Sequence, residues 1–197
     1  MSGTLITLEG LDCSGKSTNV EYIASYLSRK GYTVTTTKEP FNDNVKQIIH
    51  QYTISNNTQL ALFLADRLDH IEQVIKPALD RGEVVVCDRF IDSTIAYQGY
   101  GNGHNVHRLK ALMSYLSNDI YPHLTLFFDI TPEESVARLR SRKHIDTQFE
   151  NYEFLSRVYA GYQHEMDTLR RRVEFINAMR PLPIVQSDLT KILDSKF

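Results

Sequence analysis

Short apolar runs alternate with longer segments of helical periodicity along this chain. Five runs rich in apolar or β-branched residues are predicted as strands, at 5–8, 32–37, 84–87, 124–128 and 173–176. Apolar residues at spacings of three and four predict helices over 19–27, 58–80, 150–166 and 182–193. Since strands that alternate with helices pair in parallel through right-handed crossovers, we expect an α/β fold: a central parallel five-stranded sheet flanked by helices.

Helix signals refine this pattern at three places. Gly31 follows Arg29 and Lys30 and is predicted to end the first helix, because glycine tolerates a left-handed cap. Pro77 is expected to bend the long helix or mark its last turns. Thr131 to Glu134 has the pattern of a helix start, with Thr131 as cap, Pro132 at the first helical position and Glu134 completing a capping box.

Composition narrows the class of protein. A length of 197 residues, with 42% apolar and 23% charged residues, suits one globular domain spanning 1–197. Lys and Arg number 22 against 24 acids, a net charge of −2 that argues against a dedicated nucleic-acid or membrane-surface binder. Two cysteines are too few for a four-ligand zinc site or a disulfide framework. No apolar run or leader pattern suggests a membrane span or export, so we expect a cytoplasmic protein.

The segment from Gly10 to Ser17 matches the phosphate-loop pattern G-x-x-x-x-G-K-[ST] in full, between a predicted strand and a predicted helix. Backbone amides of such a loop face a β-phosphate, Lys16 reaches the β and γ oxygens, and the Ser17 hydroxyl ligates Mg²⁺. The motif therefore predicts a nucleoside triphosphate with Mg²⁺, held by Gly10, Leu11, Asp12, Cys13, Ser14, Gly15, Lys16, Ser17 and Thr18. It selects no reaction, because GTPases, motor ATPases and small-molecule kinases share it.

Asp88 and Arg89 follow the predicted strand at 84–87. At the carboxyl edge of a parallel sheet, where ligands bind, an acid can hold Mg²⁺ and an arginine can grip a phosphate. An ATPase acid or a helix-capping aspartate would occupy the same place, so Asp88 alone leaves the reaction open. The N-K-x-D string that reads guanine is absent, which weakens the GTPase alternative.

Beyond these motifs, the chain resembles the thymidylate kinase family of nucleoside monophosphate kinases in five ordered segments. They are Gly10 to Thr18; Thr37-Lys38-Glu39-Pro40, similar to T-R-E-P; residues 62–67, similar to L-F-x-A-x-R; 88–90, 93–94 and 96–99, similar to D-R-Y…S…A-Y-Q-G; and 121–125, similar to P-D-L-T. The resemblance implies a P-loop kinase that transfers a phosphoryl group from Mg·ATP to dTMP, giving dTDP. It also implies a homodimer and a mobile lid.

The resemblance assigns roles position by position. Phe63 would stack on the pyrimidine, Arg67 would bond a base carbonyl, and Tyr97 would pack under the sugar. Arg89 would bind the acceptor phosphate, and Asp12 would contact the sugar 3′-hydroxyl. The implied substrate residues are Lys38, Pro40, Phe63, Arg67, Arg89, Ser93, Thr94, Tyr97 and Gln98. Without the resemblance, Phe63 is equally well explained by core packing.

The basic segment at about 138–147 resembles the lid of the family, although its composition alone favours a solvated helix face. Some members carry an arginine in the phosphate loop where this chain has Cys13, so the catalytic arginine is expected from the lid. The choice of catalytic arginine among Arg138, Arg140 and Arg142 stays open, and Arg142 is the best placed of the three. The predicted catalytic residues are Asp12, Lys16, Asp88, Arg89, Arg138 and Arg142, and the predicted metal ligands are Ser17 and Asp88.

Two departures from the family pattern affect specificity. Lys38 replaces an arginine and loses its bidentate fork, and Phe41-Asn42 stands where two glycines are common. Strict thymidylate selectivity is therefore an open question. The alternatives are a deoxynucleotide or deoxynucleoside kinase of altered base choice, or a degenerate nucleotide-binding module. The intact Lys16 and Ser17 argue against the degenerate module.

Overall fold

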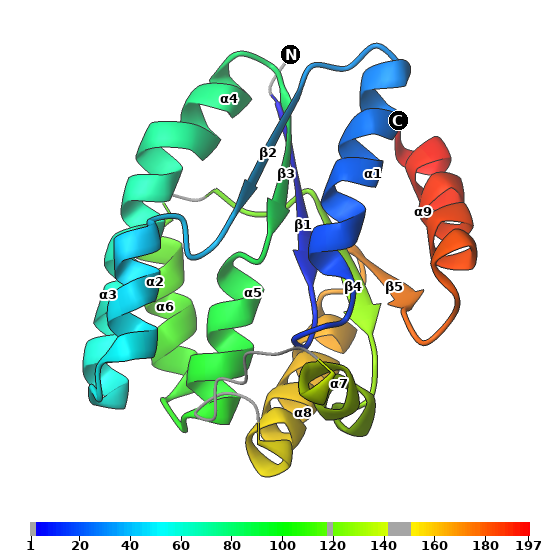
Figure 1. The fold of residues 1–197 in the computed structure, drawn as a ribbon. Coiled ribbons are helices and arrows are strands. Elements are labelled where there is room, and N and C mark those ends of the chain that lie inside the picture. Colours follow the sequence, from blue (N-terminus) through cyan, green and yellow to red (C-terminus); the bar gives the residue numbers. More distant parts are fainter. Residues whose placement is uncertain (1–2, 118–119, 142–150) are drawn as a thin grey trace.

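The computed structural model describes residues 3–117, 120–141 and 151–197. Five parallel strands form one sheet in the order β2-β3-β1-β4-β5 (Figure 1). Their bounds are β1 Thr4–Glu9, β2 Val34–Lys38, β3 Val84–Asp88, β4 Leu124–Asp129 and β5 Val173–Asn177. The predicted fold class and all five predicted strands are confirmed.

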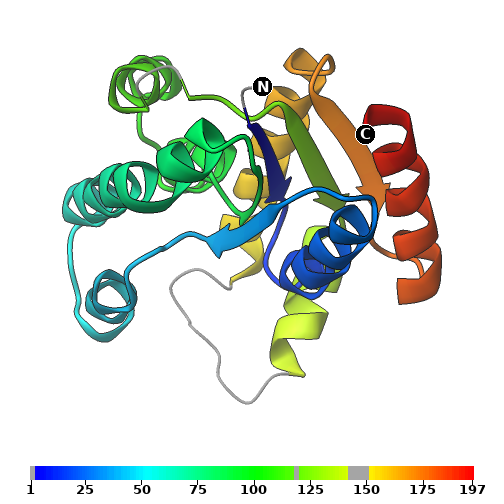
Figure 2. The ribbon, with the colours of Figure 1, turned by 90° about the horizontal axis from the view of Figure 1, so that it is seen from above.

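Helices pack on both sides of this sheet, as Figure 2 shows from above. They are α1 Lys16–Arg29, α2 Asp43–Gln51, α3 Asn56–His70, η1 Ile71–Ile75, α4 Lys76–Asp80, α5 Ile91–Thr94, η2 Ile95–Gly101, α6 Val106–Leu116, α7 Pro132–Arg140, α8 Tyr152–Thr168 and α9 Leu182–Lys196; η1 and η2 are π-helical. Successive residues of the central strands point to opposite faces of the sheet and pack in different cores. Ile6 and Val86 belong to the core around α1 and α9, and Leu5 and Val85 belong to the core around η1 and α4.

The predicted helix over 58–80 is three contiguous segments. The backbone continues from α3 through the wider turns of η1 into α4. Pro77 lies in the first turn of α4, where its missing N–H cannot bond one turn back, and the widened turns directly precede it. The expectation that Pro77 perturbs this helix is confirmed, and the perturbation is a change of helix type.

No range was predicted for four further helices: α2, α5, η2 and α6. The only residue of α2 that is fully buried is Ile49, so an apolar stripe is almost missing from its sequence. The helix is fixed instead by its cap, where the Asn42 side chain accepts the Asn44 N–H at 2.9 Å. The predicted start of α7 is confirmed: Thr131 Oγ1 accepts the Glu134 N–H at 3.3 Å.

Strand order fixes where a site can form. Because β1 and β3 are neighbours in parallel register, with Leu8 opposite Asp88, the loop after β1 and the turn after β3 leave the sheet side by side. Residues 10–15 and 88–90 therefore meet at the carboxyl edge, which is where ligands bind in such sheets.

Candidate active site

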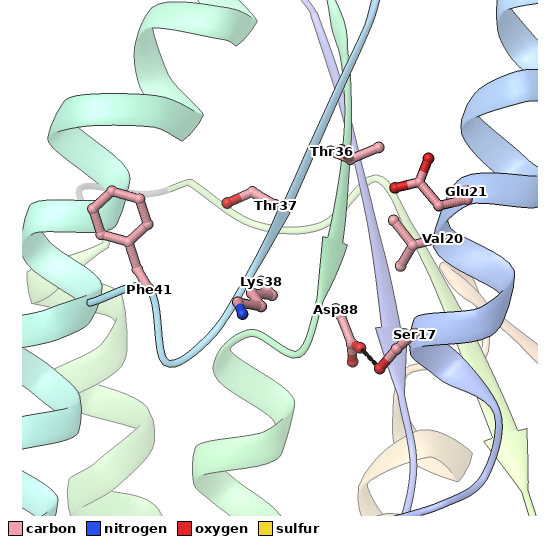
Figure 3. Close-up of a pocket in the computed structure, with 8 residues that line it drawn as sticks. All are labelled: Ser17, Val20, Glu21, Thr36, Thr37, Lys38, Phe41 and Asp88. Atoms are coloured by element: carbon pink, nitrogen blue, oxygen red, sulfur yellow. Dashed lines mark hydrogen bonds between the residues drawn. The ribbon is translucent and has the colours of Figure 1, made fainter. Parts of the chain in front are cut away.

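Two adjoining cavities open at this edge. The inner cavity, of about 380 Å³, is lined by Asp12, Ser17, Lys38, Glu39, Pro40, Lys46, Ile49, His50, Phe63, Arg67, Asp88, Arg89, Ser93, Thr94, Tyr97 and Gln98. The edge cavity, of about 410 Å³, is lined by Ser17, Val20, Glu21, Thr36, Thr37, Lys38, Phe41 and Asp88 (Figure 3). Ser17, Lys38 and Asp88 belong to both, so the two cavities are parts of one cleft.

The structure brings together every residue that the sequence assigned to the substrate. The residues Lys38, Pro40, Phe63, Arg67, Arg89, Ser93, Thr94, Tyr97 and Gln98 all line the inner cavity, although they come from three separate stretches of the chain, 38–40, 63–67 and 89–98. Sequence reasoning missed Glu39, Lys46, Ile49 and His50. The last three lie on or beside α2, the helix whose pattern gave no prediction.

The phosphate loop has the backbone that its glycines predict. Gly10 has φ 140°, and a Cβ there would lie 2.5 Å from the Phe128 carbonyl oxygen. Gly15 has φ 95° and directly precedes α1. Both conformations favour glycine, and the second aims the first N–H groups of α1 at the loop. The geometry is that of an anion cradle.

Lys16 lies beneath this loop and is only 5% exposed. Its ammonium donates to the Leu11 carbonyl at 2.7 Å and to the Gly10 carbonyl at 3.1 Å. Burial, together with the charge of Arg89, lowers the pKa of Lys16 to about 8. A polyphosphate in the loop would counter both effects and favour the charged ammonium.

Ser17 and Asp88 form a paired hydroxyl and carboxylate. Ser17 Oγ donates to Asp88 Oδ2 at 2.5 Å (Figure 3). The other carboxylate oxygen, Asp88 Oδ1, is buried and has no hydrogen-bond partner among the described residues. An orphaned anionic oxygen beside a hydroxyl suits Mg²⁺, which takes one or two protein oxygens together with phosphate oxygens and water. The residues present fit that ion. The described ranges hold no cluster of three or more His, Cys, Asp or Glu side chains around one point.

Several contacts hold the Arg89 side chain in the cleft. Its backbone has φ 71°, unusual for a residue with a Cβ. Nη2 donates to Asp12 Oδ1 at 2.6 Å, and Nη1 donates to the Gly10 carbonyl and to Ser93 Oγ, each at 3.2 Å. The guanidinium carbon lies 4.8 Å from the centroid of the Tyr97 ring. Arg89 is thus fixed against the phosphate loop with its charge at the inner cavity.

Asp12 completes this group. Tyr97 donates its hydroxyl to Asp12 Oδ2 at 2.8 Å, opposite the Arg89 contact. Although burial favours the neutral acid, the charges of Arg89 and Lys16 outweigh it and lower the pKa of Asp12. Asp12 is therefore an acceptor-only carboxylate in the working pH range.

Glu9 is a buried carboxylate beneath the site that sequence reasoning missed. It accepts the Phe90 N–H at 2.8 Å, the Ser93 hydroxyl at 2.5 Å and the Tyr162 hydroxyl at 3.1 Å. Burial, with the nearby charge of Asp92, raises the pKa of Glu9 to about 7. The signal was present in the sequence, since an acid in an apolar central strand next to a glycine loop needs buried partners.

The predicted lid arginines have different places. Arg138 donates from Nη1 to the Cys13 carbonyl at 3.2 Å and from Nη2 to the Ala178 carbonyl at 3.1 Å, so it joins the phosphate loop to the segment after β5. Arg140 is exposed at the end of α7. Arg142 lies outside the described residues.

Comparisons with known proteins agree on one family. A family model described as Thymidylate kinase matches residues 8–189. A thymidylate kinase of Exiguobacterium sp. is 37% identical over 96% of this chain and 93% of its own length, and one of Pseudomonas entomophila is 38% identical over 98% and 96%. The crystal structure of thymidylate kinase from Ehrlichia chaffeensis superposes with a TM-score of 0.80 at 31% identity, covering 98% of this chain and 99% of that one.

Proposed function

Since the chain belongs to the thymidylate kinase family, we propose the roles of its residues in that family's reaction, with ATP as the phosphoryl donor and Mg²⁺ as the metal. The chain phosphorylates dTMP to dTDP and is a nucleoside monophosphate kinase. The observation that carries the roles is the convergence of two anion-binding groups. The phosphate loop and Arg89 meet at one cleft, and every residue expected at the acceptor lines its inner cavity.

The donor end lies at the phosphate loop. Residues Gly10 to Thr18 would hold the triphosphate through backbone amides and the Lys16 ammonium. Ser17 and Asp88 would hold Mg²⁺, which supplies charge neutralisation to the phosphate oxygens when it is bound. Their fit to the ion is supported by the unpartnered Asp88 Oδ1.

The acceptor end lies in the inner cavity. Arg89 would bind the dTMP phosphate, and Lys38 and Pro40 would form the wall beside it. Phe63 would stack on the thymine, with Arg67, Thr94 and Gln98 at the base edge and Tyr97 at the sugar. In this arrangement Asp12 fixes Arg89 and lies beside the sugar hydroxyl, so it orients the acceptor and carries no covalent role.

Phosphoryl transfer needs alignment of the two phosphates and positive charge around the moving group. Lys16 would supply fixed charge to the donor phosphates and Arg89 to the acceptor phosphate, and both donate to the Gly10 carbonyl. Arg138 lies at the donor side, and we propose that Arg142, in a lid over about 138–147, adds the remaining charge when it closes. The whole of 1–197 acts as one kinase domain in this proposal.

The assembly and location of the enzyme are proposed from the resemblance. We propose a homodimer. Leucines 60 and 64 of α3 and 112 and 116 of α6 pack against the core but stay only half-buried, which leaves apolar surface for a second copy to cover. We also propose that it works in the cytoplasm. Among the described residues, no helix combines the length and the apolar character that crossing a bilayer requires.

The test is phosphoryl transfer from Mg·ATP to a panel of nucleosides and monophosphates, followed by product separation. We expect dTMP to be the best acceptor and thymidine to give no product. Turnover of thymidine without turnover of dTMP would contradict the proposal. A Lys16→Ala protein should lose turnover on every acceptor, and an unchanged rate would remove the phosphate loop from the reaction.

A further inference from the structure

Glu39 is a buried carboxylate in the segment after β2 that lines the inner cavity and was not predicted as a site residue. Its side chain is only 6% exposed. It accepts the Arg67 Nε–H, with 3.1 and 3.0 Å from Nε to its two oxygens, and an Arg67 Nη2–H at 2.5 Å. A contact made through two of the three guanidinium nitrogens, Nε and Nη2, fixes the plane of that group as well as its position.

A further layer fixes Glu39 itself. His70 Nδ1 lies 3.2 Å from Glu39 Oε1, and His70 Nε2 lies 2.6 Å from Thr37 Oγ1. Because a carboxylate only accepts, Nδ1 carries the hydrogen, and in the neutral ring Nε2 accepts from the threonine. The Phe41 ring stacks on His70 at 4.9 Å between centroids. The carboxylate is therefore held between α3 and the segment after β2.

The same segment is fastened to α3 through its backbone. The Asp66 carboxylate accepts the N–H groups of Phe41 and Asn42, each at 2.7 Å. Phe41 consequently packs over His70 and does not line the inner cavity. The Phe41 ring therefore lies outside the inner cavity and adds to the support of Glu39 through His70.

The donors of Arg67 can then be counted. A guanidinium has five N–H groups. Nε–H and one Nη2–H bind Glu39, the other Nη2–H binds the Phe90 carbonyl at 3.1 Å, and one Nη1–H faces the Met113 sulfur at 3.0 Å. The remaining Nη1–H has no hydrogen-bond partner among the described residues. Arg67 lines the inner cavity one helical turn from Phe63, so this donor belongs to the stretch of wall beside the stacking ring.

We propose that Glu39 is a positioning residue that sets base selectivity. By fixing the Arg67 guanidinium, it leaves one N–H in a fixed orientation. This N–H donates to a base that has a carbonyl at this edge and disfavours a base that has an amino group there. The inference rests on the proposed function, in which the acceptor base stacks on Phe63. An amino group opposite this N–H would leave two donors facing each other in a buried site, which is costly. A guanidinium free to rotate would lose that discrimination.

The experiment compares kcat/KM for dTMP, dUMP and dCMP in the wild type, Glu39→Gln and a control. Of these bases, uracil differs from thymine only by a methyl group, whereas cytosine carries an amino group in place of one carbonyl. The control is Glu165→Gln, since Glu165 is an equally buried carboxylate that binds Lys110 at 2.6 Å and Tyr100 at 2.9 Å and lines neither cavity. Thermal unfolding of all three proteins reports whether they fold.

In Glu39→Gln we expect the preference for dTMP over dCMP to fall at least about tenfold, while the ratio of dTMP to dUMP and the KM for ATP change less than about threefold. Glu165→Gln should keep all ratios. An unchanged preference over dCMP in folded Glu39→Gln overturns the inference, as does an equal loss for dUMP, which would indicate general damage to the cavity. Absence of dTMP turnover in the wild type would instead refute the proposed function.

If Glu39→Gln does not fold, Thr37→Val provides the same test one step further from the base. It removes the hydroxyl that holds His70, and should lower the preference over dCMP by about threefold with the dUMP ratio unchanged. A preference equal to that of the wild type in folded Thr37→Val overturns the inference.

Discussion

At the residue scale, the cleft depends on charged side chains whose positions are fixed before any substrate binds. Arg89 bonds Asp12, the Gly10 carbonyl and Ser93, and its positive φ turns the side chain toward the phosphate loop. Such preorganisation removes the cost of ordering a long side chain when the ligand arrives. It also makes the residue hard to replace.

We predict that Arg89→Lys lowers kcat/KM for dTMP by about a hundredfold, because a lysine ammonium is a point charge that cannot bond Asp12 and a phosphate in a fixed fork. Steady-state kinetics with each substrate varied checks this. The KM for ATP should stay within about threefold. Arg170→Lys, at a highly exposed arginine, is the control and should leave kcat/KM for dTMP unchanged. Wild-type kinetics in Arg89→Lys would show that Arg89 does not bind the acceptor.

Glu9 predicts a pH dependence of stability. Its pKa is raised from 4.5 in the unfolded chain to about 7 in the fold. Its stabilising contribution is therefore complete below pH 4.5 and is lost as pH rises through 7, a change of about 3 kcal/mol for a shift of this size. Urea unfolding between pH 4 and 8 should show the wild type losing stability relative to Glu9→Gln, whose side chain does not titrate. Parallel pH profiles for the two proteins would contradict this assignment.

The residues that sequence reasoning missed have a common physical cause. Glu9 and Glu39 act on other side chains: one holds the Phe90 amide and Ser93, the other holds Arg67. Ser93, Thr94, Tyr97 and Gln98 could be placed in the cleft from the sequence because they belong to a motif. Partnerships between residues about 30 or 80 positions apart appear only when the chain is folded.

At the scale of elements, the strands were predictable and several helices were not. Each central strand is buried on both faces, so it reads as a continuous apolar run. In α2 a capping side chain and a single buried isoleucine replace the apolar stripe. In η2, buried polar and aromatic residues pack against α8. This tertiary packing stabilises a π-helix that the intrinsic helix propensities of its residues do not predict.

The contact between α8 and η2 predicts a sensitive glycine. A Cβ on Gly161 would lie 2.5 Å from Cγ of the Tyr100 ring. We predict that Gly161→Ala costs about 2 kcal/mol of stability, because overpacking must push the two helices apart. It should also raise the KM for dTMP, since η2 carries Tyr97 and Gln98. Denaturant unfolding and steady-state kinetics check the two effects. Ala160→Ser, at an exposed position of the same helix, is the control and should lower the free energy of unfolding by about 0.5 kcal/mol or less. Stability equal to the wild type would show that the contact relaxes without cost.

At the scale of the whole molecule, the order of the strands determines what the site can be. β1 lies between β3 and β4, so the loop that would hold the donor and the turn that would hold the acceptor leave adjacent strands. In the proposed single kinase domain the two substrates would meet at this edge, beneath the proposed lid. The composition and the alternating pattern predict one such domain.

The proposed homodimer gives a prediction at this scale. Leu64 on α3 and Leu112 on α6 pack against the core and are half-buried, so part of each side chain is exposed. Light scattering after size-exclusion chromatography should give twice the 22.7 kDa chain mass for the wild type. Leu112→Glu, together with Leu64→Glu, should shift the enzyme toward the monomer, because burying a carboxylate at an interface is costly. The exposed Leu182→Glu is the control and should remain dimeric. A wild-type mass of a single chain would contradict the dimer.

The position of Phe41 bears on the design of selective inhibitors. Its ring lies across the edge cavity from Val20 and Glu21, and Lys38 links that cavity to the inner one (Figure 3). A compound that extends a thymidine-like head past Lys38 toward this ring would gain an aromatic contact that an enzyme with glycine at position 41 cannot offer. Comparing its inhibition constants for this enzyme and for Phe41→Gly would measure that advantage, which we expect to be about tenfold. Equal constants would place the extension elsewhere.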